Sequence, residues 1–176
     1  MLLMFGALLC GITYWSSRAS REKDWHYWGV LALLFLFLSL DENIQFHEKI
    51  AEHLTPALPT DLNGFIHWSW VVPYSVLIVA AGLFFISFVL RLPMLTRRLF
   101  LISGLVFVTG AFGLELLEGY FFKLYGLDHI INKLLYCIEE LLEMWAVILF
   151  LYALLDYMNA KRIQLSFGRE LHQPQL

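Results

Sequence analysis

Charged residues are scarce in this chain. Lysine, arginine, aspartate and glutamate make up 15% of its 176 residues, while 60% are hydrophobic. Soluble domains contain about 25% charged and about 45–50% apolar residues. The mean hydropathy is +0.68. This composition excludes an ordinary water-soluble domain and predicts an all-α, polytopic membrane helical bundle.

The chain also has few cysteines and no dense cluster of basic residues. The two cysteines, Cys10 and Cys137, both lie within apolar segments. That placement is typical of small buried residues and not of a disulfide or a metal-binding pair. The formal net charge is −3 and no strongly basic patch occurs, so nucleic acid is not an expected partner.

Long apolar segments occupy most of the chain. A helix rises about 1.5 Å per residue, and the hydrocarbon core of a bilayer is about 30 Å thick. We expect one segment to end at Thr55, because Pro56 disfavours helical backbone angles at the residue before it. We expect five transmembrane helices, at about 2–15, 26–54, 68–90, 99–122 and 130–158, in a single domain over 1–158, followed by a polar tail at 159–176.

Basic residues lie mostly on one side of this five-helix arrangement. By the positive-inside rule that side is cytoplasmic, which places the N-terminus outside and the tail in the cytoplasm. The remaining Lys49, Lys123 and Lys133 fall on the other side. The residues that set this orientation are Arg18, Arg21, Lys23, Arg91, Arg97, Arg98, Lys161, Arg162 and Arg169.

Three of the expected helices carry ionisable groups at membrane depth. Such groups are energetically unfavourable in a bilayer, so each is a candidate functional residue. Measured along the helices, most of them fall in the outer half of the membrane, with Glu143 near the midplane. The candidate site residues are Asp41, Glu42, His47, Glu48, Glu115, Glu118, Glu139, Glu140 and Glu143.

Helical spacing groups these side chains into stripes. Glu139 and Glu143 are four residues apart, and Glu115 and Glu118 are three apart, so each pair shares a face. His47 lies about 120° from Asp41 around an ideal helix. Asp41 and His47 can therefore belong to one site only if this helix bends, or if His47 serves a neighbouring shell.

The expected cluster has no lysine or arginine inside the membrane to balance it. Several ionised carboxylates then have to share protons or bind a cation. Carboxylates from facing helices hold two metals in ferritin-like bundles, although this chain has Glu-x-x-Glu twice and no Glu-x-x-His. The sequence predicts a site for a divalent metal: iron, manganese, calcium, magnesium or zinc.

The stretch Ser-Leu-Asp-Glu at 39–42, followed by His47-Glu48 at the end of an apolar helix, resembles uncharacterised small bacterial multi-pass inner-membrane proteins. The resemblance covers about one helix. It implies a location in the bacterial inner membrane, and no activity comes with it.

Three functions fit these patterns. The first is a metal site open to the outside, in a metal-handling protein or an enzyme that acts on a lipid-like substrate. The second is a proton or cation path, although the cytoplasmic half is poor in polar residues. The third is an accessory subunit that pairs with a partner membrane subunit or with a second copy. A structural role, with protonated carboxyls joining helices, is the alternative to all three, and Glu48 also suits a solvated helix at the membrane surface.

Overall fold

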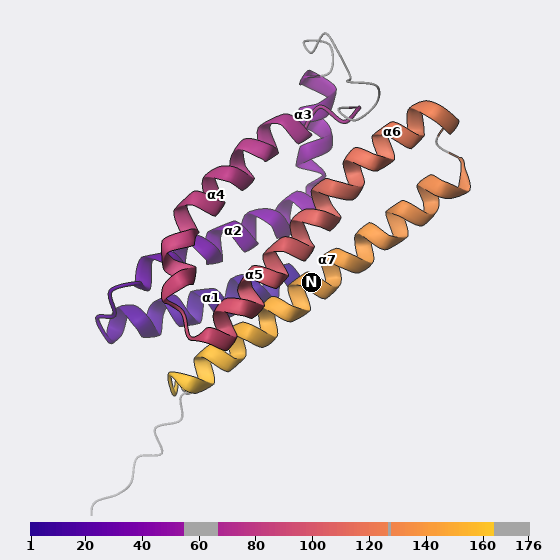
Figure 1. Cartoon of the computed structure of the whole chain (residues 1–176). Helices are drawn as coiled ribbons and strands as arrows, with labels where there is room; N and C mark the ends of the chain where they lie inside the picture. Colours follow the sequence, from indigo (N-terminus) through magenta and orange to yellow (C-terminus); the bar gives the residue numbers. More distant parts are fainter. Residues whose placement is uncertain (55–66, 127, 164–176) are drawn as a thin grey trace, which may run out of the picture.

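The chain is described here from a computed structural model, which covers residues 1–54, 67–126 and 128–163. Every regular element within these residues is helical, which confirms the all-α class (Figure 1). The elements are α1 (Leu2–Ala19), α2 (Trp25–Ile44), α3 (Phe46–Leu54), α4 (Val71–Arg91), α5 (Met94–Val108), the π-helix η3 (Thr109–Leu114), α6 (Glu115–Tyr125) and α7 (Ile130–Ala160).

Three stretches of the described chain are long and apolar enough to cross a membrane. They are α2, α4 and the continuous run α5–η3–α6 from Met94 to Tyr125. Their apolar side chains are largely exposed: Leu83 on α4 is 74% exposed and Leu105 on α5 is 69% exposed. In water this surface would be unfavourable, so these helices are compatible with a membrane protein.

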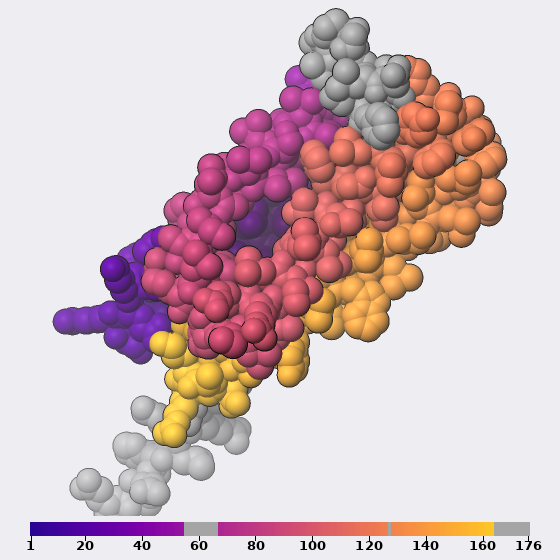
Figure 2. Space-filling model, viewed as in Figure 1, coloured from indigo at the N-terminus to yellow at the C-terminus, as the bar shows by residue number. Residues whose placement is uncertain are grey.

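The helices run alongside one another as an elongated bundle. α1 packs along α2, and α5 packs along the second half of α7. α4 is less tightly held, and Figure 2 shows a hollow between it and the α5–α6 stretch, with the indigo N-terminal segments visible at its floor.

The hydrophobic core lies at one end of the bundle, where the α1–α2 turn meets the last turns of α4 and α7. Trp28 is fully buried there, with its ring 4.8 Å from that of Tyr157 and 5.1 Å from that of Phe88. Phe35 stacks on Phe150 at 4.4 Å. Towards the other end burial falls away: α3 has no buried residue, and α6 buries only Gly119.

The predicted helix 26–54 is wrong as one continuous helix, because it breaks at Gln45. Gln45 has left-handed backbone angles, φ 53° and ψ 49°, and separates α2 from α3. The cause is local: the carboxylate of Asp41 accepts a hydrogen bond from the backbone N–H of His47 at 2.9 Å. This bond caps the start of α3, a competition between side chain and backbone that hydrophobic periodicity does not reveal.

The predicted helix 99–122 is longer and less regular than expected. It starts at Met94, directly after Pro93, and contains the π-helical turn η3 before it reaches Tyr125. Gly110 in η3 lies against α7: a Cβ there would be 3.1 Å from the Cβ of Leu142 and 3.4 Å from the carbonyl oxygen of Glu139. A π turn also shifts the phase of the side chains that follow it, here those of α6.

Candidate metal site

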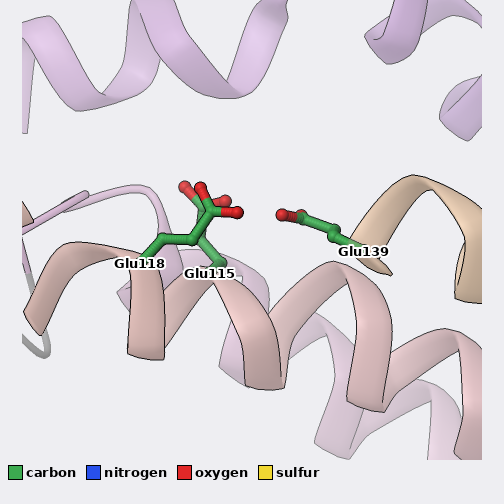
Figure 3. Close-up of side chains that lie close together, drawn as sticks. All are labelled: Glu115, Glu118 and Glu139. Atoms are coloured by element: carbon green, nitrogen blue, oxygen red, sulfur yellow. The ribbon is translucent and has the colours of Figure 1, made fainter. Parts of the chain in front are cut away.

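Three carboxylates meet where α6 faces α7. Glu115, Glu118 and Glu139 each offer one oxygen, and these oxygens all lie within 4.8 Å of one another. In Figure 3 Glu115 and Glu118 rise side by side from one helix, and Glu139 extends from the other towards them. All three side chains are half-buried. We call these three residues the acidic triad.

Local helix geometry explains how the triad assembles. Glu115 and Glu118 are three residues apart at the start of α6 and therefore share a face. The close approach at Gly110 brings the backbone of Glu139 against η3, one turn before Glu115. One oxygen of Glu118 is buried and has no hydrogen-bond partner among the described residues. Buried polar atoms are seldom left unpaired, so this oxygen is suited to accept a proton or a cation.

An aromatic group connects the triad to α3 and α4. The indole N–H of Trp70, just before α4, donates to a carboxylate oxygen of Glu115 at 3.3 Å. The Trp70 ring lies 5.2 Å from the ring of His47 and 5.0 Å from that of Tyr74. Trp70 is not among the candidate site residues. It falls within the predicted span 68–90, and nothing in the sequence indicated its bond to Glu115.

Asp41 and His47 form a pair of their own. Asp41 is buried, with 7% of its surface exposed, and His47 Nδ1 lies 3.1 Å from its second carboxylate oxygen. The bend that would let the two residues join one site is therefore present, at Gln45. Both oxygens of Asp41 face His47, so this pair is separate from the triad. Trp70 lies between them, with its ring against His47 and its N–H on Glu115.

The remaining candidate residues lie around the triad and not within it. Glu143 follows Glu139 by one turn and interacts electrostatically with Glu42 of α2, Glu140 and Glu115. Glu42 and Glu48 are exposed, and Glu48 accepts a hydrogen bond from Gln45 at 3.0 Å. Residues of α2, α6 and α7 thus approach one another, and among the described residues three of the candidates, Glu115, Glu118 and Glu139, bring carboxylate oxygens within 4.8 Å of one another.

These observations define a class of protein: a helical bundle with three apolar helices compatible with a membrane and a half-buried acidic triad away from its core. The chain belongs to the family described as a domain of unknown function (DUF8692), whose model matches residues 1–158. No curated protein and no solved structure matches it.

Proposed function

We propose that this protein binds a divalent metal ion at the acidic triad. The observation that carries the proposal is the approach of three carboxylate oxygens to within 4.8 Å of one another. Like charges at this distance in a half-buried site favour either proton sharing or a bound cation. Three oxygen ligands from two helices match the needs of a hard cation, which takes further ligands from water or substrate.

The ligands in this proposal are Glu115, Glu118 and Glu139. Oxygen ligands favour magnesium, calcium, manganese and iron, whereas zinc prefers nitrogen and sulfur. Trp70 orients Glu115 through its N–H, and Glu143 adds negative potential one turn away. Asp41, His47, Glu42, Glu48 and Glu140 then act on the site from outside the ligand set.

The membrane arrangement belongs to the same proposal. We infer five spans with the N-terminus outside and the tail in the cytoplasm of a bacterial inner membrane. The acidic triad then lies in the outer half of the bilayer. This arrangement is favoured by the concentration of basic residues at the opposite end of the bundle, including Arg91, Arg97 and Lys161. A metal in the outer half is accessible to a lipid-like substrate, for which it would activate water.

A proton or cation path is the second candidate. It is favoured by the same clustered carboxylates, which can pass a proton between them. Against it, the other end of the bundle is filled by the aromatic side chains around Trp28. An accessory role beside a partner membrane subunit, or in a homo-oligomer, is a third possibility.

Metal content separates these functions. We expect the detergent-purified protein, incubated with Mn²⁺ and desalted, to retain about one equivalent by elemental analysis. Glu115→Gln and Glu139→Gln should each weaken Mn²⁺ binding by about 10–100-fold or more, because each removes a charged ligand. Glu52→Gln, an exposed carboxylate of α3, is the matched control and should leave binding unchanged.

Two results would overturn the metal proposal. One is that the wild-type protein retains no more Mn²⁺, Fe²⁺, Mg²⁺, Ca²⁺ or Zn²⁺ than the Glu52→Gln protein retains in the presence of a chelator. The other is equal retention by the wild type and the triad variants. Proton flux into liposomes by metal-free protein would then favour the second candidate.

A further inference from the structure

A second polar site lies at the opposite end of the bundle from the acidic triad. It is a cavity of about 460 Å³ between the α1–α2 turn and the ends of α4 and α7. Its charged lining residues are Glu22, Lys23, Asp24, Arg91 and Lys161. Nothing in the proposed metal function uses this cavity.

Two ion pairs fix the positions of charged residues that line the cavity. Arg91 binds Asp24 through two nitrogens, Nε at 3.2 Å and Nη2 at 2.7 Å. The ammonium group of Lys161 donates to Glu22 at 2.9 Å. That hydrogen bond raises the pKa of Lys161, which keeps the group cationic. The Arg91 guanidinium also lies over the Tyr27 ring, 5.6 Å from its centre.

The cavity lining has an excess of positive charge and more hydrogen-bond donors than the two ion pairs use. Lys23, Arg91 and Lys161 outnumber Glu22 and Asp24 by one charge around the cavity. Arginine has five N–H donors and lysine has three, and the ion pairs with Asp24 and Glu22 use two and one of them, respectively. An arginine held by two hydrogen bonds to Asp24 has a fixed guanidinium group, whose planar geometry suits phosphate oxygens.

Buried polar atoms without partners occur at the same end. The indole N–H of Trp28 is fully buried and lacks an acceptor among the described residues. Its ring packs on Phe88 and Tyr157, which both line the cavity. The hydroxyls of Ser17 and Thr96 are also buried and unpartnered within the described residues. Such groups are usually satisfied by water or a ligand, so this end of the bundle can offer hydrogen bonds to a polar partner.

The uncharged walls of the cavity are apolar. Phe88, Leu92 and Pro93 line it where α4 ends, and neighbouring Leu90 is 54% exposed on the outside of that helix. A ligand here therefore meets cations and apolar surface together. Basic pockets between membrane helices bind the headgroups of anionic lipids for this reason. We propose that the cavity binds the phosphate headgroup of an anionic phospholipid, with Arg91, Lys161 and Lys23 as its cationic contacts.

Lipid selectivity tests the proposal. Native mass spectrometry would compare the protein, purified in detergent with chelator present, after addition of phosphatidylglycerol or phosphatidylcholine with identical chains. The chelator makes the result independent of the metal site. We expect phosphatidylglycerol to bind several-fold more tightly. Lys161→Gln should weaken its binding about fivefold, since each basic group near the membrane surface contributes about that factor. Lys133→Gln, the same change at the acidic end, is the matched control and should have no effect.

A second variant, expected to bind phosphatidylglycerol more tightly, distinguishes a lost lipid contact from misfolding. Glu22→Gln removes a carboxylate from the lining and frees Lys161, so phosphatidylglycerol should bind more tightly. If the ion pairs only stabilise the fold, Glu22→Gln and Lys161→Gln will weaken binding alike, which overturns the proposal. Equal binding of the two lipids by the wild type overturns it as well. So does thermal stabilisation by inorganic phosphate that matches the effect of phosphatidylglycerol, because the site would then bind a soluble anion.

Discussion

The two ends of the bundle differ in residue type: one is mainly aromatic and the other is acidic. At one end Trp28, Phe35, Phe88 and Phe150 pack into the hydrophobic core, and two ion pairs tie the α1–α2 turn to α4 and α7. At the other end α3 and α6 bury almost nothing, and three carboxylates approach one another. Clustered like charges oppose folding, so the aromatic end has to supply the stability that the acidic end lacks.

The largest effect should come from the aromatic end. Trp28→Ala should lower the free energy of unfolding by about 3–5 kcal/mol, because it removes a fully buried ring and leaves a cavity. Trp145→Ala, whose side chain is 55% exposed on α7, is the control and should change stability little. Denaturant titration in mixed micelles measures both. Equal losses would mean that burial at this end does not carry the stability of the fold.

The next effect should appear at the break between α2 and α3. Asp41→Ala leaves the His47 backbone N–H without its acceptor and should destabilise the protein by about 1–3 kcal/mol. Relative to the wild type, backbone amides of α3 should exchange hydrogen faster in Asp41→Ala, while exchange around Trp28 should stay unchanged. The exposed Glu52→Gln should leave exchange in both regions as it is. Uniform acceleration over the whole chain would show that the two ends do not open separately.

An effect of similar size should come from the contact between η3 and α7. Gly110→Ala places a Cβ about 3.1 Å from that of Leu142, so α7 has to move away. We expect a loss of about 1–3 kcal/mol, typical of overpacking, and weaker Mn²⁺ binding because Glu139 moves with its helix. Gly104→Ala has no atom within 4 Å of the new Cβ and should stabilise α5 by about 0.5–1 kcal/mol. Unchanged Mn²⁺ binding in Gly110→Ala would contradict the role given to this contact.

The smallest effect should be a gain in stability. Glu118→Gln removes a carboxylate three residues from Glu115 on the same helix and should stabilise the metal-free protein by about 0.5 kcal/mol. The same variant should gain less stability from added Mn²⁺ than the wild type, because ligand binding stabilises in proportion to affinity. A metal-free Glu118→Gln protein that is less stable than the wild type would show that this carboxylate makes a necessary structural bond.

Much of the acidic site could be predicted from spacing alone. Glu115 with Glu118, and Glu139 with Glu143, share helix faces whatever the tertiary structure, and their segments are close in the chain. The bond from Trp70 to Glu115 could not be predicted, because those residues are 45 positions apart. The break at Gln45 was not predicted either. The apolar segment runs directly into charged residues there, and no glycine or proline marks the end of a helix.

The amino-acid sequence by itself determined the helical class, the apolar segments and the presence of carboxylates within them, because these depend on composition and on local spacing. Only the tertiary structure decided which carboxylates meet. Helix packing at Gly110 selected Glu115, Glu118 and Glu139, and the hydrogen bonds to His47 kept Asp41 apart. Such choices depend on distances between elements remote in the chain, which no single stretch of sequence encodes.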